Sequence, residues 1–344
     1  MRKLFVVLLL TVLILFIDLY GKLLYSQYIS LGPNGDKKVI IPRPKNKIEQ
    51  TSMTAISHLV GRDIESLLAQ FGEPVRTEPS AYDYEWWIYN RNLEQYVQFG
   101  ILNNKIVTIY VAGEAVDISP FRIGQNYADI YAQYPFSYEL TLDNSNGSYE
   151  FELSETEVNE QPLISLENGW AQLYFDKFTR RLTGIRYMDS ETLLKQRPYE
   201  LIYTGKLLEP APLSPEQMQR VEQANAKQVL DLTNIIRVRH ELPLLKWDEK
   251  TAQVAYLHSK DMKESNYFSH ESPKFGTLGD RLSRGNVPFR AAGENIAAHY
   301  NDGIAAVQGW LNSEGHRKNM LNAEFTGLGV GVYDKYYTQN FIRK

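Results

Sequence analysis

The sequence predicts an α+β protein in which helices precede antiparallel hairpins. Between residues 57 and 195, apolar residues recur twice at helical spacing, and each such run is followed by strand-like segments. Toward the C-terminus, capped helical segments are followed by a closing hairpin. The 344 residues are enough for two folded domains. An apolar N-terminal segment precedes both.

Residues 1–26 are predicted to form a signal anchor. Arg2 and Lys3 precede an apolar run from Leu4 to Ile17, which is the pattern of a secretory signal. Apolar residues continue past Asp18, and no pair of small residues marks a cleavage site. We therefore expect a single-pass protein at the cell membrane with its bulk outside. A secreted protein, released by cleavage of the signal, is the alternative.

Residues 27–56 are predicted to be an extracytoplasmic linker, because Pro42 and Pro44 and a Gly-Pro-Asn-Gly turn interrupt regular structure. The next part, 57–195, has the pattern of an internally duplicated α+β domain. The helical segment from Gly61 to Gly72 parallels the one from Gly124 to Pro135.

Each copy contains a predicted hairpin, at 97–110 in the first and 171–187 in the second. The aromatic residues Tyr82, Tyr84, Trp86 and Trp87 are expected in the core of this domain. An exposed platform for carbohydrate or peptide is the alternative interpretation.

Residues 196–215 are rich in proline and are predicted to be an interdomain linker open to proteases. The last domain, 216–344, should begin with a long helix from Pro215 to about His240, followed by a second helix from about Asp248 to Ser265. A further helix is expected from about Gly303 to Glu314, ended by Gly315.

The charge distribution argues against nucleic-acid binding. Residues 57–195 contain 10 Lys and Arg against 21 Asp and Glu, and the whole chain has a net charge of −4. The chain has no cysteine, which excludes disulfides, a thiolate metal site and a cysteine nucleophile.

Histidines and glutamates gather in three short segments near the C-terminus. Four of the six histidines lie between positions 258 and 316. The segments contain His270, then Glu294, then Glu314 and His316. Imidazoles with nearby carboxylates can bind a divalent metal or form an acid–base centre. The alternative is that each residue caps a helix or satisfies a buried polar group, and His258 is expected to be such a packing residue.

Several motifs in order give the region 228–341 a resemblance to a known family. They are Leu232–Arg239, Leu242–Asp248, Ala255–Met262, Tyr267–His270, Gly293–Ala297 and Ser313–Leu321. The sequences of these motifs resemble those of the CAP superfamily (cysteine-rich secretory, antigen 5, pathogenesis-related 1; also called SCP or PR-1-like), in its bacterial cysteine-free branch. The layout of 57–195 resembles the CAP-associated domain that precedes such modules.

The resemblance implies an α-β-α sandwich with a surface cleft lined by two histidines and two glutamates. These map onto His270, Glu294, Glu314 and His316. His270 and His316 are the predicted metal ligands, with Glu294 and Glu314 supporting them. If the turn at Gly315 ends a helix, the Glu314 and His316 side chains should point the same way.

Three functions remain open from the sequence. The first is a cell-envelope module whose cleft binds a divalent metal such as zinc, a small amphipathic ligand or lipid, or a peptide. The second is a metal-assisted hydrolase in which Glu294 or Glu314 is the general base. The third is a structural envelope protein without turnover. The expected partners are the membrane, through the N-terminal segment, and a small ligand or peptide, but not nucleic acid.

Overall fold

The computed structural model describes residues 55–344, which belong to one compact unit. The predicted signal anchor and the predicted linker up to residue 54 lie outside the described residues. Between residues 55 and 344, no helix combines the length and the hydrophobicity needed to cross a membrane.

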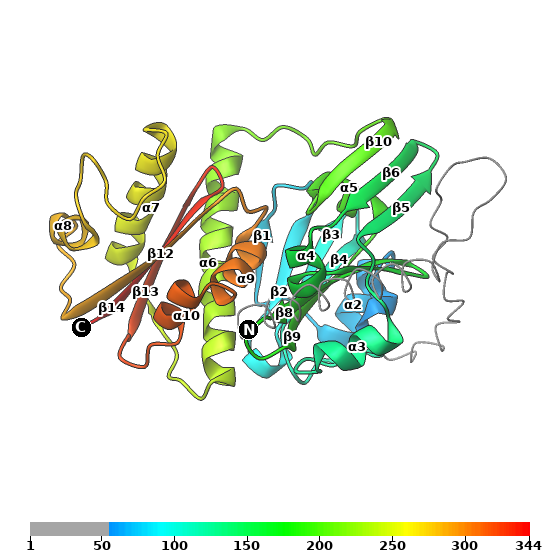
Figure 1. Ribbon diagram of the computed structural model, residues 1–344, viewed down its shortest axis with the longest axis horizontal. Coiled ribbons are helices and arrows are strands. Elements are labelled where there is room, and N and C mark those ends of the chain that lie inside the picture. The colour runs from blue at the N-terminus through cyan, green and yellow to red at the C-terminus, as the bar shows by residue number, and fades with distance from the viewer. Residues whose placement is uncertain (1–54) are drawn as a thin grey trace, which may run out of the picture. The chain divides into compact units, whose positions relative to one another are not determined.

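The N-terminal lobe is built on a seven-stranded antiparallel sheet (Figure 1). In the order of their hydrogen bonding, the strands are β1 (Arg76–Pro79), β2 (Glu85–Tyr89), β3 (Val97–Leu102), β4 (Lys105–Val111), β9 (Arg181–Met188), β8 (Gly169–Asp176) and β7 (Leu163–Leu166). The helices beside the sheet are η1 (Ile56–Leu59), α2 (Ile64–Phe71), η2 (Leu93–Gln95), α3 (Tyr127–Gln133), α4 (Glu155–Glu160) and α5 (Ser190–Gln196). Both hairpins lie where the alternating sequence predicts them.

The predicted duplication is confirmed by matching backbone contacts in the two halves of this sheet. The N–H of Gly61 donates to the carbonyl of Ile106, and the N–H of Gly124 donates in the same way to Leu182. Both glycines have a positive φ, 82° and 83°, which residues with a side chain rarely adopt. Each half also contains one β-bulge, and the pairing of β4 with β9 joins the halves.

A three-stranded sheet corrects the first part of the linker expected at 196–215, whereas residues 206–214 form no helix or strand. The sheet has the order β10-β6-β5, formed by β10 (Glu200–Gly205), β6 (Gly147–Glu152) and β5 (Glu139–Asn144). Strand β10 lies inside the predicted linker, where Leu201 pairs with Phe151 and packs against the core. Leu201 therefore gains burial from strand pairing, while Ile202 and Tyr203 of the same strand stay exposed.

The C-terminal lobe contains a four-stranded sheet and five helices. The sheet has the order β11 (Lys246–Trp247), β13 (Gly327–Tyr333), β14 (Tyr336–Arg343) and β12 (Ala291–Ala298). The helices are α6 (Pro215–Arg239), α7 (Glu249–Glu264), α8 (Leu278–Arg284), α9 (Gly303–Leu311) and α10 (Glu314–Met320).

Alternation along β13 explains why helices cover both faces of this sheet. A Cβ atom on Gly331 would lie 1.9 Å from the backbone nitrogen of Tyr256, so α7 packs directly on the glycine face of the strand. Leu328 and Val330 point to the opposite face, where they share a core cluster with α6 and α9. The predicted α-β-α sandwich is therefore confirmed (Figure 1).

The expected helix from Gly303 to Glu314 is wrong in its C-terminal part. Helix α9 ends at Leu311, and a new helix, α10, begins at Glu314. Gly315 therefore lies inside α10 rather than ending α9. Strand β12 and helix α8 are not among the elements predicted above.

The two lobes share one hydrophobic cluster. Tyr82, Tyr84 and Trp86 are 2–7% exposed and belong to the same cluster as residues of α6 and α9. The prediction that these aromatic residues are in the core holds for these three, and Trp87 is half-buried against the other hydrophobic cluster, that of the N-terminal lobe. Because the cluster contains residues from both sides of the predicted linker, the lobes are one packed body rather than two separable domains.

Candidate functional site

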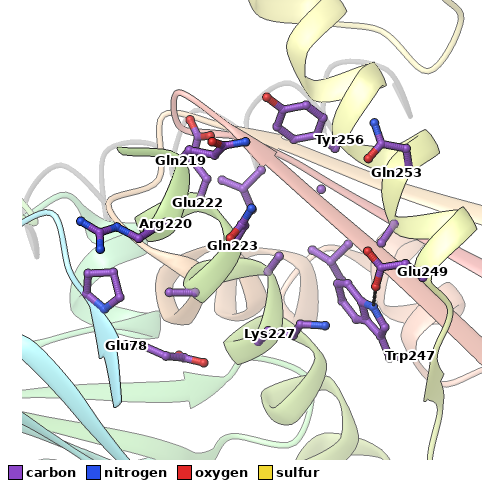
Figure 2. A pocket seen from close by; sticks show the side chains of 17 residues that line it. Glu78, Gln219, Arg220, Glu222, Gln223, Lys227, Trp247, Glu249, Gln253 and Tyr256 are labelled. Carbon is purple, nitrogen blue, oxygen red and sulfur yellow. Dashed lines mark hydrogen bonds between the residues drawn. The ribbon is translucent and has the colours of Figure 1, made fainter. Parts of the chain in front are cut away.

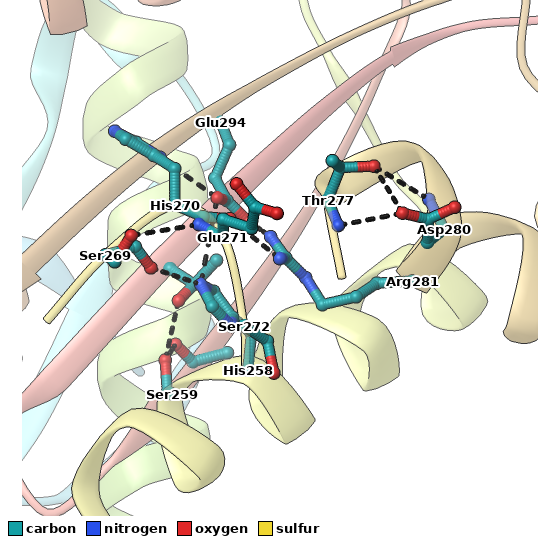
Figure 3. A network of polar contacts seen from close by, with 12 residues as sticks. His258, Ser259, Ser269, His270, Glu271, Ser272, Thr277, Asp280, Arg281 and Glu294 are labelled. Atoms are coloured by element: carbon teal, nitrogen blue, oxygen red, sulfur yellow. Dashed lines mark hydrogen bonds and ion pairs between the residues drawn. The ribbon is translucent and has the colours of Figure 1, made fainter. Parts of the chain in front are cut away.

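Glu294 lies at the base of the candidate site, on β12. Strand pairing with Asn340 of β14 fixes its position, and its side chain is only 3% exposed. A buried carboxylate needs hydrogen-bond donors or an opposite charge. Glu294 has both: Arg281 Nη2 lies 2.5 Å from Oε2, and His270 Nδ1 lies 3.0 Å from Oε1 (Figure 3).

Arg281 fastens the loop that contains His270. Its Nη1 atom donates to the backbone carbonyls of His270, at 2.8 Å, and Gly276, at 2.9 Å. The side chain comes from α8, which starts with a capping box between Thr277 and Asp280. One guanidinium thus binds both the carboxylate and the loop opposite it.

His258 of α7 supports the same loop from below. Its Nε2 atom lies 3.1 Å from the carbonyl of Ser269 and 3.8 Å from Glu294 Oε1, and the residue is 1% exposed. Burial and the nearby Arg281 outweigh Glu294 and lower the pKa of His258 to about 4. The imidazole is therefore neutral at pH 7 and donates its Nε2 proton to the carbonyl, a packing role such as the sequence predicts for it.

The buried neutral imidazole of His258 should make the protein sensitive to acid. In the unfolded chain its pKa is the ordinary value of ~6.5, so the unfolded state binds more protons than the folded state between pH ~6.5 and about 4. The stability present above pH ~6.5 should fall by up to ~3 kcal/mol as the pH drops through this range.

Urea unfolding at pH 7.5 and pH 4.5 measures this loss. His258→Gln keeps a donor for Ser269 but cannot titrate, so it should lose less stability between the two pH values than the wild type. Equal losses in the two proteins would contradict the assignment.

His316 lies beside His270, with the ring centroids 6.5 Å apart. It is half-buried on α10, and Asn295 donates to its carbonyl at 3.1 Å. Asn319, one turn further along the helix, donates to the carbonyl of Glu294. Burial, together with His270, lowers the pKa of His316, so this imidazole stays neutral to lower pH than a free histidine.

Glu314 does not join the other three predicted residues. Its carboxylate bonds to Lys318 Nζ at 2.8 Å on the solvent face of α10, and the side chain is 74% exposed. Because Gly315 continues the helix, residues 314 and 316 point about 200° apart around its axis. The expectation that their side chains point the same way is therefore wrong.

The residues fit a metal site made of two imidazoles rather than one with three or more ligands. Within residues 55–344, no group of three or more His, Asp and Glu could hold a metal ion. His270 pairs with Glu294 through Nδ1, so its Nε2 atom is left for a ligand, and the side chain is 56% exposed. A metal-binding histidine typically donates its second nitrogen to a carboxylate in this way.

Sequence reasoning missed Arg281, which contacts both Glu294 and the His270 loop. The available signal was the Thr277-x-x-Asp280 capping pattern, which predicts a helix that starts just before Arg281. Nothing in the sequence indicates that this helix packs behind Glu294.

Two family models match the chain. The model described as CAP-associated N-terminal matches residues 60–199, and the model of the cysteine-rich secretory protein family matches residues 230–342.

Relatives match nearly the full length. The chain is 45% identical over 328 residues to the "uncharacterized membrane protein YlbC" of Bacillus subtilis (strain 168), which covers 93% of this chain and 95% of that protein. A crystal structure of an extracellular protein containing a SCP domain, from Bacillus anthracis, is 60% identical with a TM-score of 0.82 and covers 88% of this chain and 100% of that one. A cysteine-rich secretory protein from Staphylococcus aureus is 26% identical with a TM-score of 0.77 and covers 86% and 94%.

Proposed function

The chain belongs to the cysteine-rich secretory protein (CAP) family, and from this premise we propose that it is an extracytoplasmic binding protein of the cell envelope. One relative is named a membrane protein and another an extracellular protein. Both names agree with the signal anchor predicted for residues 1–26, which would hold the folded part outside the membrane.

The binding groups in this proposal are the imidazoles of His270 and His316. The observation that carries the proposal is that Glu294, already paired with Arg281, holds His270 through Nδ1 and leaves Nε2 toward solvent beside His316. With a small rotation of the side chains toward each other, the two imidazoles would bind a divalent ion such as zinc, which supplies a Lewis acid for a ligand that contains oxygen or nitrogen. The same pair would donate to and accept from a small amphipathic ligand or a peptide.

The contacts of the two glutamates favour binding over hydrolysis. Both oxygens of Glu294 are engaged, by Arg281 and His270, and Glu314 is paired with Lys318 on the surface. A general base needs a carboxylate within reach of the attacking water. Neither glutamate offers such a free oxygen next to the two imidazoles.

Calorimetric titration of the chain from residue 51 with Zn²⁺ tests the metal-binding part. Wild type should bind, and either His270→Ala or His316→Ala should abolish binding, because one imidazole alone holds zinc weakly. Glu314→Gln is the matched control and should bind like the wild type. Affinity should be lower at pH 5.5 than at pH 7.5, since protonated imidazoles cannot be ligands.

No heat in the wild type, or equal binding by the two alanine variants and the wild type, would remove zinc from the proposal. A ligand without metal would then be sought at the same pair of histidines.

A further inference from the structure

A groove of about 560 Å³ lies between α6 and α7, along residues 330–332 of β13 (Figure 2). Trp247, Glu78 and Pro79 are also among the residues that line it. The lining includes neither His270 nor His316, so this groove is separate from the histidine pair. Its volume is within the range of small-ligand sites in proteins.

Exposed glutamines line the two walls of the groove. Gln219 and Gln223 are four residues apart on α6 and so lie on one stripe of that helix, while Gln253 extends from α7. Their side-chain amides form no hydrogen bond with residues 55–344. Each amide can both donate and accept, which suits a ligand with groups of both kinds.

Glu222 is a buried carboxylate in the lining of the groove. It is 7% exposed, and its Oε1 atom accepts the N–H of Asp334 at 2.8 Å. Burial raises its pKa. In the described part of the chain no cation pairs with it, and its Oε2 atom has no hydrogen-bond partner. A buried carboxylate with a free oxygen is stabilised by a neutral ligand that donates an O–H or N–H to it.

Aromatic rings and small apolar residues complete the lining. The Nε1–H of Trp247 donates to Glu249 at 2.7 Å, which fixes the ring, and Tyr256 packs edge-to-face on Tyr333. Ala224 and Ala252 also line the groove. Aromatic rings offer apolar contact area at a low cost in side-chain entropy, and the alanines leave room for a methyl group.

The charges of the groove are balanced. The two positive charges of Arg220 and Lys227 equal in number the two negative charges of Glu222 and Glu249. Glu78 is already bonded to Arg76 and Gln228. Lys227 lies 3.5 Å from the centroid of the Trp247 ring and would have to move for a ligand to stack there. A strongly ionic polymer would meet repulsion from one sign or the other, so a neutral ligand fits best.

We propose that this groove binds a neutral oligosaccharide of N-acetylated sugars. Sugar hydroxyls donate and accept, as the glutamine amides require, and the acetamido N–H would donate to Glu222 while its methyl packs on the alanines. The C–H face of a sugar ring would pack on Tyr256 or Trp247. The proposal is independent of the histidine pair.

Calorimetry with the chain from residue 51 tests the proposal. The probes are chitotetraose, a neutral tetrasaccharide of N-acetylglucosamine, and cellotetraose, which has the same linkage without the acetamido group. Chitotetraose should bind the wild type at least about tenfold more tightly than cellotetraose. The Gln223→Ala/Gln253→Ala variant should weaken chitotetraose binding at least about tenfold, because two polar partners are removed.

Two control variants should bind like the wild type. Gln70→Ala removes an exposed glutamine from α2, far from the groove in sequence, and His270→Ala disables the histidine pair only. Thermal unfolding confirms that each variant is folded. Absence of chitotetraose binding in the wild type, or unchanged binding in the double glutamine variant, would overturn the proposal. Equal affinity for the two sugars would overturn the role of the acetamido group.

Discussion

Replacing Arg186 with methionine is expected to destabilise the whole unit from residue 55 to residue 344 by ~3–5 kcal/mol. Arg186 Nη2 on β9 lies 2.6 Å from Asp302 Oδ2, at the start of α9, and the two side chains are 2% and 7% exposed. Its Nη1 atom donates to Gln196. The variant leaves the Asp302 carboxylate buried without its counter-ion, and the Coulombic loss is large because little water replaces the guanidinium.

Urea unfolding followed by fluorescence and by circular dichroism measures this loss. The wild type should show one transition by both probes, because Arg186 and Asp302 belong to different lobes that share a core. Lys318→Met is the control: it breaks an exposed pair with Glu314 and should cost less than ~1 kcal/mol.

Asp302→Asn, combined with Arg186→Met, should recover part of the loss, since the amide still caps α9 by accepting the N–H of Ala305. A loss below ~1 kcal/mol in Arg186→Met, or two separate transitions in the wild type, would contradict the picture of one cooperative body.

The contrast between local and distant contacts explains which parts of the fold could be predicted. The hairpins β3–β4 and β13–β14 are each encoded within about 15 residues, by strand-forming apolar segments on both sides of a turn. The cap of α6 at Ser214 is equally local. The junction of the lobes depends on pairs such as Arg186 and Asp302, which are 116 positions apart. Such a pair leaves no periodic signal, and neither does the pairing of β10 with β6, which places part of the proline-rich stretch in a sheet.

The candidate site divides in the same way. The motifs around His270, Glu294 and His316 name three side chains that the fold does bring together. The direction in which the Glu314 side chain points depends on whether Gly315 ends a helix or lies inside one. The sequence around Gly315 is compatible with either conformation. Arg281 acts through α8 packing behind β12, which is a tertiary contact with no sequence spacing to reveal it.

Replacing Arg281 with methionine is expected to cost ~3–5 kcal/mol and to abolish zinc binding at the histidine pair. Arg281 and Glu294 are 4% and 3% exposed, so the variant leaves in the interior a carboxylate whose remaining hydrogen-bond partner is His270. It also releases the carbonyls of His270 and Gly276 from the Arg281 Nη1 atom. Arg281→Lys should rescue little, because one ammonium cannot span the carboxylate and two carbonyls as the planar guanidinium does.

The pH dependence of this loss of stability distinguishes the effect of the buried charge from the effect of lost packing. In the variant, the Glu294 carboxylate would stay buried without the guanidinium, and burial disfavours the charged form of a carboxyl group. A carboxyl with a raised folded pKa stabilises the fold below its unfolded pKa, and that stability disappears as the pH rises through the folded pKa. The difference in unfolding free energy between wild type and Arg281→Met should therefore be smaller at pH 4.5 than at pH 7.5.

Adding Glu294→Gln to Arg281→Met removes the buried charge, so the double variant should regain stability and lose this extra pH dependence, while zinc binding stays absent. A loss of equal size at both pH values, with no recovery in the double variant, would mean that Arg281 acts only through packing. Zinc binding that survives in Arg281→Met would show that the loop keeps His270 in place without the guanidinium.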